Sequence, residues 1–143
     1  MSLNANELPT RRQVLVIDDQ PGIRRLLTEV LKEAGYEVIT AANGYEGLEK
    51  VKELNPDLVL LDMKMPGMDG IETLCELKRR DFKSGIIMMT AYGELDLLNA
   101  AKEQGAHDYV IKPFDINLLC RVVENTIAYI ADSEAAASGL TAG

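Results

Sequence analysis

The sequence predicts an α/β fold in which a doubly wound, five-stranded parallel sheet is covered by five helices. Two observations favour this fold. Short apolar runs rich in β-branched residues alternate along the chain with longer stretches in which apolar residues recur at helical spacing. The strand-like runs are apolar throughout, which is typical of strands buried on both faces. A chain of 143 residues is long enough for one such domain.

The first half of the chain contains two strand–helix pairs. Residues 13–17 (QVLVI) form a short strand, and helical spacing of apolar residues then runs from 23 to 34. A second strand is expected at residues 36–39. Asn43 is a suitable N-cap for the next helix, whose apolar stripe spans residues 45–54.

The second half repeats the alternation three times. The expected strands are residues 57–61, 85–89 and 108–111. Each is followed by a stretch with helical spacing, namely residues 71–77, 95–101 and 116–130. We therefore expect a domain over residues 12–131, preceded by a disordered N-terminal segment (1–11). Residues 132–143 are rich in Ala, Ser and Gly and are expected to be a flexible tail or the start of a linker.

Composition excludes several classes of function. The formal net charge of −8 disfavours direct nucleic-acid binding, which depends on clustered Lys and Arg. Two cysteines far apart in the chain and a single histidine disfavour a disulfide scaffold or a zinc site. The chain has no apolar run long enough for a membrane span and no secretory signal. We expect a cytoplasmic protein with no membrane association.

Chemistry-bearing residues follow the predicted strands. Asp18 and Asp19 come after the first strand, Asp62 after the third, Thr90 after the fourth and Lys112 after the fifth. In an open parallel sheet the carboxyl ends of the strands meet at one edge, which is where ligands bind. We therefore expect these five side chains to converge.

Three clustered carboxylates repel one another unless a cation is present. Their oxygens suit a hard divalent cation, and Mg²⁺ fits best because it binds through a few carboxylates and partners phosphate oxygens. A lysine pairs with phosphate, and a threonine hydroxyl can donate to it. The expected site therefore performs phosphoryl transfer with a carboxylate nucleophile.

Four motifs at these strand ends resemble those of response-regulator receiver domains. They are VLVIDDQ (14–20), DLVLLDMKMPGMDG (57–70), MMTAYG (88–93) and VIKPF (110–114). Several of these stretches are particularly similar to the single-domain receivers of sporulation phosphorelays. The resemblance spans about residues 12–130 and implies the flavodoxin-like receiver fold with strand order 2-1-3-4-5.

The resemblance also implies a role for each site residue. Asp62 accepts the phosphoryl group from a phosphohistidine on a histidine kinase or histidine phosphotransferase. Asp18, Asp19, Asp62 and the backbone carbonyl of Lys64 hold Mg²⁺, for which Mn²⁺ can substitute. Thr90 and Lys112 contact the phosphoryl group.

Further positions have expected roles in switching. Thr90 moves upon phosphorylation, and Tyr109 lies where the family often has an aromatic switch residue. The small side chain of Ala91 leaves room for the phosphoryl group, and the bond between Lys112 and Pro113 is expected to be cis.

Two expectations concern phosphate lifetime and docking. Lys64 and Tyr92 would flank the acyl phosphate and hinder the attacking water, so that Lys64→Asn should speed dephosphorylation. Gln20, Pro21, Gly22, Ile23 and Arg24 would lie beside the phosphorylation edge and dock the phosphoryl donor.

The leading hypothesis is a phosphoacceptor that switches or relays a signal through contacts with a downstream protein target, without turning over a metabolite. One alternative is the N-terminal receiver of a longer DNA-binding transcriptional regulator. A more distant one is an aspartate-nucleophile phosphatase, which is disfavoured because such enzymes carry a D-x-D arrangement, whereas Asp18 and Asp19 are adjacent. A flavin-binding module is disfavoured because the acidic DDQPG segment would repel the flavin phosphate.

Overall fold

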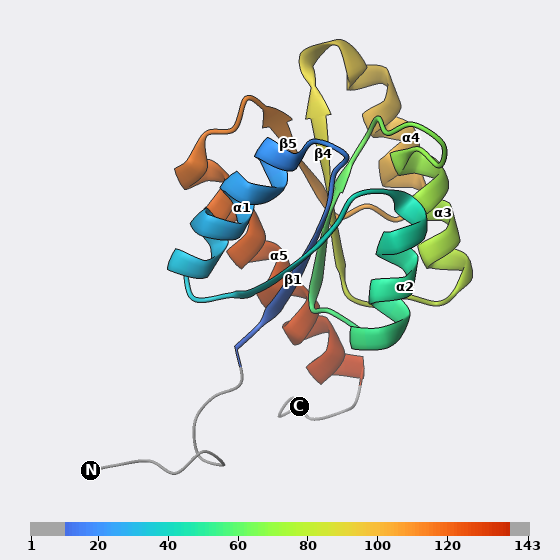
Figure 1. Ribbon diagram of the computed structural model, residues 1–143. Helices are drawn as coiled ribbons and strands as arrows, with labels where there is room; N and C mark the ends of the chain where they lie inside the picture. The colour runs from blue at the N-terminus through green and yellow to red at the C-terminus, as the bar shows by residue number, and fades with distance from the viewer. Residues whose placement is uncertain (1–10, 138–143) are drawn as a thin grey trace.

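The computed structural model describes residues 11–137 and contains one five-stranded parallel sheet in the order β2-β1-β3-β4-β5, as predicted (Figure 1). The strands are β1 (Gln13–Ile17), β2 (Glu37–Ala41), β3 (Leu58–Asp62), β4 (Gly85–Ala91) and β5 (Asp108–Lys112). The helices are α1 (Pro21–Glu33), α2 (Gly44–Leu54), α3 (Gly70–Arg79), α4 (Leu95–Glu103) and α5 (Ile116–Ala137), with a short 3-10 turn η1 (Tyr92–Glu94) before α4.

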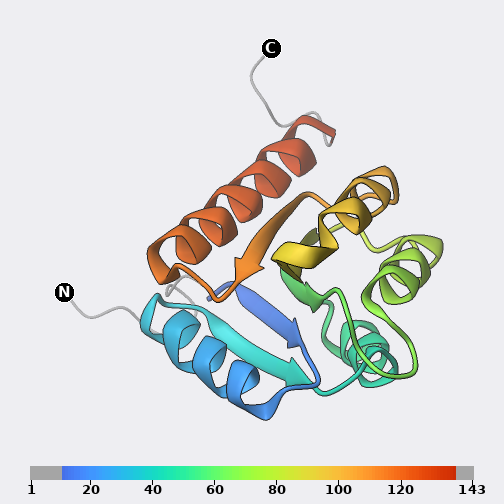
Figure 2. The same ribbon diagram turned by 90° about the horizontal axis from the view of Figure 1, so that it is seen from above.

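Helices cover both faces of the sheet, so the central strands β1, β3 and β4 are buried on two sides, whereas the edge strands β2 and β5 are mostly half-buried (Figure 2). Alternate residues of the strands point to opposite faces. Leu15 and Val59 pack with α2, α3 and α4 on one face, whereas Val16 and Leu60 pack with α1 and α5 on the other. This arrangement explains why the strand sequences are apolar throughout.

The parallel register aligns the carboxyl ends of the central strands. Ile17 pairs with Leu61, and Asp62 pairs with Met89 one residue further along. The loops that follow β1, β3 and β4 therefore leave the sheet at the same edge, which we call the carboxyl edge.

Local signals fix where helices begin at this edge. The Asn43 side chain accepts a hydrogen bond from the backbone N–H of Glu46, as predicted, and Asp69 accepts one from Glu72 in the same way at α3. Each cap satisfies one of the backbone donors that a helix N-terminus leaves without a partner. Helix α3 thereby starts directly after the loop that follows Asp62.

Several boundaries differ from those predicted. β2 begins and ends later than expected, and β4 continues two residues further, to Ala91. The prediction of a flexible tail from residue 132 was wrong for residues 132–137, which continue helix α5 to Ala137. Alanine has the highest helix propensity, so an Ala-rich continuation of an amphipathic helix remains helical. Residues 1–10 and 138–143 lie outside the described residues, so the expectations for these segments stay predictions.

Two further expectations can be compared with the fold. The peptide bond between Lys112 and Pro113 is cis, as expected. Within residues 11–137, none of the helices combines the length and hydropathy that a membrane crossing requires.

Candidate functional site

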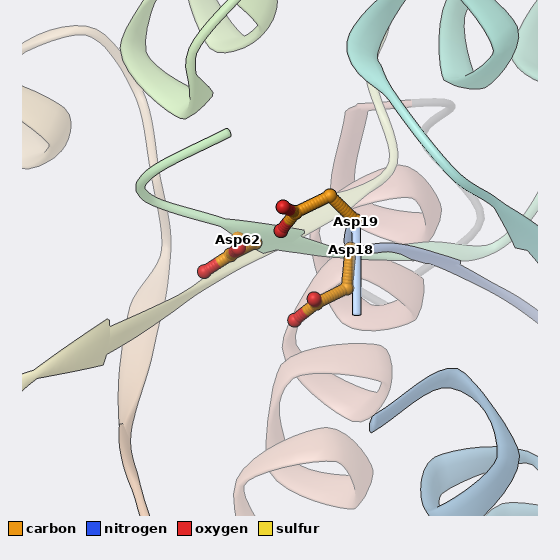
Figure 3. A group of neighbouring side chains, drawn as sticks. All are labelled: Asp18, Asp19 and Asp62. Carbon is orange, nitrogen blue, oxygen red and sulfur yellow. The ribbon is translucent and has the colours of Figure 1, made fainter. Parts of the chain in front are cut away.

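The three predicted carboxylates converge at the carboxyl edge. Asp18 and Asp19 follow β1, and Asp62 is the last residue of β3. Each offers a ligand oxygen, and these oxygens all lie within 4.8 Å of one another. Figure 3 shows the Asp62 and Asp19 side chains pointing toward the same region, with Asp18 beside them. Asp18 and Asp62 are buried and Asp19 is exposed, so the cluster opens to solvent on one side.

Lys112 completes the group from the end of β5. Its ammonium Nζ lies 2.7 Å from Asp18 Oδ2 and 3.2 Å from Asp62 Oδ1. Burial lowers the pKa of Lys112, but its hydrogen bond to Asp18 and the charge of Asp62 outweigh that effect and raise the pKa overall. The lysine therefore stays charged at neutral pH.

One ammonium does not balance three carboxylates. Burial, followed by the charge of Asp18, raises the pKa of Asp62 to about 6, although Lys112 acts in the opposite direction. A raised carboxyl pKa in a cluster of this kind indicates that a further cation would be bound favourably.

The donor set fits a magnesium ion. Mg²⁺ takes oxygen ligands and keeps several of its own waters, so it does not need a closed protein cage. Asp19 is exposed and Asp62 lies within reach of it, while Asp18 is already held by Lys112 and by the backbone. The partly open cluster therefore offers carboxylate ligands together with space for water.

The β1–α1 loop is held by two contacts to Asp18. The backbone N–H of Gln20 donates to Asp18 Oδ1 at 2.8 Å, and the Arg24 guanidinium donates to the Asp18 carbonyl oxygen at 2.7 Å. Both residues were predicted to dock a partner. Their contacts also give them a structural role, because they fix the loop that presents the carboxylates.

The other predicted docking residues surround this loop. Pro21 and Gly22 are exposed, whereas Ile23 is half-buried and packs against the core formed with α1 and α5. An ideal Cβ added to Gly22 would meet no atom within 4 Å. The surface at Gly22 is therefore open beside the carboxylate cluster.

The predicted switch residues lie on strands β4 and β5, and the predicted lifetime residues lie in the segments that follow β3 and β4. Thr90 is fully buried near the end of β4, and its hydroxyl donates to the Ala91 carbonyl at 3.2 Å. Lys64 is exposed, and so is Tyr92, at 71%. Tyr109 is half-buried and, together with Tyr92, lines a groove of about 360 Å³ between β5 and α5.

Gly70 has a role that sequence reasoning did not assign. A Cβ at this position would lie 2.3 Å from the Asp62 carbonyl oxygen and 2.8 Å from Met63 Cα. Only glycine lets the start of α3 approach the end of β3 so closely. The residue thereby fixes the backbone of Asp62, and its place at the end of the DLVLLDMKMPGMDG motif was the available signal.

Glu94 is a second residue that sequence reasoning missed. It ends the short turn η1, and only 9% of the residue is exposed. Its Oε1 accepts a hydrogen bond from the Ala91 backbone N–H at 2.8 Å. An acidic residue in the polar stretch GELD reads as a surface residue, so no sequence signal indicated its burial.

Comparisons with known proteins agree with this geometry. The family model of the response regulator receiver domain matches residues 14–124. The chain is 53% identical over 105 residues to sporulation initiation phosphotransferase F of Bacillus subtilis, covering 73% of this chain and 85% of that protein. It is 38% identical over 115 residues to the regulatory protein AtoC of Escherichia coli, covering 80% of this chain and 25% of AtoC.

A solved structure gives the same result for the fold. Chemotaxis protein CheY4 of Vibrio cholerae superposes with a TM-score of 0.77 at 31% identity, covering 82% of this chain and 99% of that one. These relatives give no support to the phosphatase alternative. The shared motifs, the strand order and the acidic cluster at the carboxyl edge identify this chain as a member of the response regulator receiver domain family, whose members act as phosphoacceptors in signalling.

Proposed function

We propose that Asp62 is the phosphoacceptor of this receiver and that its donor is a phosphohistidine on a histidine kinase or histidine phosphotransferase. The observation that supports this most strongly is the position of Asp62. It is buried at a strand end, within reach of two other carboxylates and 3.2 Å from the Lys112 ammonium. Asp18 is also buried and lies 2.7 Å from Lys112, but its Oδ1 accepts the Gln20 N–H and its Oδ2 pairs with Lys112, whereas Asp62 pairs with Lys112 through Oδ1 alone.

The reaction follows from the positions of the side chains. A carboxylate oxygen of Asp62 attacks phosphorus, the bond from phosphorus to the donor nitrogen breaks, and the imidazole leaves with the electron pair. Lys112 pairs with the negative charge of the transferred group, and the Thr90 hydroxyl leaves the Ala91 carbonyl to donate to one of the phosphoryl oxygens. Asp18, Asp19, Asp62 and the Lys64 carbonyl would hold Mg²⁺, or Mn²⁺ in its place. The cation would neutralise charge on the phosphoryl oxygens.

The acceptor can be tested with a small phosphodonor. Incubation of the full chain with acetyl phosphate and Mg²⁺ should add the mass of one phosphoryl group, and Asp62→Asn should abolish the gain. Asp57→Asn is the matched control, because Asp57 lies just before the opposite end of the same strand. Equal incorporation into the wild type and Asp62→Asn would contradict the proposal.

The donor-docking surface can be tested at Gly22. Because the surface there is open, Gly22→Arg should fold normally and accept phosphate from acetyl phosphate at the wild-type rate. Transfer from a phosphohistidine protein should slow at least about tenfold, because the added side chain blocks the approach of the donor helix. Gln104→Arg, which adds the same charge at the exposed end of α4, is the control.

We further propose a relay role in which the phosphoryl group passes on to another protein. Similarity to sporulation initiation phosphotransferase F, over most of the length of that protein, supports it. The alternative is the receiver of a longer transcriptional regulator, since AtoC matches over only a quarter of its length. Return of the phosphoryl group from Asp62 to a histidine of a phosphotransferase would favour the relay.

A further inference from the structure

The turn that follows β4 places a buried carboxylate beside Lys64. Glu94 Oε2 lies 3.8 Å from Lys64 Nζ, and the Lys64 side chain is 72% exposed whereas that of Glu94 is only 10% exposed. Oε2 has no hydrogen-bond partner within the described structure. A buried carboxylate oxygen without a hydrogen bond is costly, so the ammonium of Lys64 is its main compensation.

The other oxygen of Glu94 connects this ion pair to Thr90. Oε1 accepts the N–H of the peptide that joins Thr90 to Ala91. Thr90 is fully buried, and its hydroxyl is held by the Ala91 carbonyl. One carboxylate therefore contacts the Lys64 ammonium on one side and the backbone at the end of β4 on the other, in the segment at the top of Figure 1.

Lys64 is also close to the acceptor in sequence. It lies two residues after Asp62, in the loop that leaves the end of β3. A phosphoryl group on Asp62 would add a second anion to this region and compete with Glu94 for the flexible, exposed ammonium.

We infer that Glu94 is a positioning residue that holds Lys64 away from Asp62 and loses this partner when Asp62 is phosphorylated, so that the β4–α4 turn senses the phosphoryl group through a buried carboxylate. This inference rests on the proposed function of Asp62. In this inference the turn couples the position of Lys64 to the backbone at Thr90. The lifetime of the phosphoryl group then depends on whether the Lys64 ammonium pairs with Glu94 or with the phosphoryl group.

The test is a double-mutant cycle on the lifetime of the acyl phosphate. Dephosphorylation occurs when water attacks phosphorus and the bond to the Asp62 oxygen breaks, releasing inorganic phosphate. Glu94→Gln keeps an oxygen acceptor for the Ala91 N–H but removes the charge that holds Lys64. Lys64 should then pair with the phosphoryl group and shield it, lengthening the half-life about threefold or more.

The same change should have no effect in a Lys64→Met background, where there is no ammonium to release. Half-lives are followed by intact mass after removal of acetyl phosphate. If Glu94→Gln changed the half-life by the same factor in both backgrounds, or in neither, the inference would be overturned. A role of Glu94 in folding alone would give the first of these results.

A second readout needs no phosphorylation. The amide resonance of Ala91 should shift upon Lys64→Met in the wild type and shift by less than half as much in the Glu94→Gln background. Equal shifts in both backgrounds would refute the ion pair. If Asp62 gained no phosphoryl group in any variant but the amide shifts were coupled, the acceptor proposal would fail and the link between Lys64 and Ala91 would stand.

Discussion

The two ends of strand β3 each carry an aspartate, and the two side chains have opposite surroundings. Asp57, immediately before β3, accepts the backbone N–H of Gln13 with Oδ2 at 2.7 Å and lies 3.5 Å from the exposed Arg12 guanidinium with Oδ1. Its charge is matched by local donors. Asp57 therefore joins the starts of β1 and β3.

Asp62 at the carboxyl edge is surrounded by groups of its own charge. Its neighbours are Asp18 and Asp19, and within residues 11–137 only Lys112 pairs with this cluster. A carboxylate therefore stabilises the fold where its neighbours are hydrogen-bond donors, and is available for chemistry where its neighbours leave negative charge unmatched.

His107 lies just before β5, at the edge where the strands begin, which we call the amino edge, and like Asp57 it is held by local hydrogen bonds. Its ring Nδ1 accepts the Ile86 backbone N–H, and its backbone N–H donates to the Ile86 carbonyl. Burial, together with the charge of Lys78, lowers the pKa of His107, so the neutral ring that can accept is favoured. The single histidine is thus part of the pairing between β4 and β5.

Replacing Lys112 should have the largest effect on stability. Without a divalent cation, Lys112→Met should lower the free energy of unfolding by about 2–4 kcal/mol, because it leaves Asp18 and Asp62 buried without their partner. Saturating Mg²⁺ should restore much of this loss. Urea denaturation with and without Mg²⁺ measures both values. If the urea midpoint of Lys112→Met equalled that of the wild type with and without Mg²⁺, the carboxylates at the carboxyl edge would not carry the unmatched charge described above.

Removing the charge of Asp62 should raise the free energy of unfolding, whereas replacing Lys112 lowers it. Because its folded pKa of about 6 exceeds the ordinary value of 3.8, ionisation of Asp62 destabilises the folded state increasingly as pH rises from about 4 to 6. Asp62→Asn should therefore add about 1–3 kcal/mol at pH 7 without metal, and little below pH 4. Thermal unfolding at both pH values provides the measurement, and a loss of stability at pH 7 would contradict the account.

Removing the charge of Asp57, at the amino edge, should change the free energy of unfolding by less and should lower it. Asp57→Asn weakens the charged acceptor for Gln13, so it should lower the free energy of unfolding by about 1 kcal/mol. The loss should be the same with and without Mg²⁺. Urea denaturation in both conditions would reveal any Mg²⁺ dependence, which would place Asp57 in the functional cluster after all.

The sequence was sufficient for the alternation of strands and helices and for the convergence of Asp18, Asp62 and Lys112, whereas the strand order was implied by the resemblance to receiver domains. The strands are encoded by local apolar runs, and the strand exits place polar residues at one edge whatever the details of packing. The burial of Glu94 could not be predicted from the sequence, because this side chain becomes buried only when a polar turn folds over the edge of the sheet. The end of α5 was misread because Ala-rich composition suits both a linker and a helix.

Calorimetric titration of the unphosphorylated chain with Mg²⁺ can show whether Asp18, Asp19 and Asp62 hold one cation in common, as we claim. We expect one ion per chain, an affinity at least about tenfold lower in Asp19→Asn, and an unchanged affinity in Asp57→Asn. Equal affinities in the wild type and Asp19→Asn would show that the carboxylates at the carboxyl edge do not hold a common cation, and would contradict the claim.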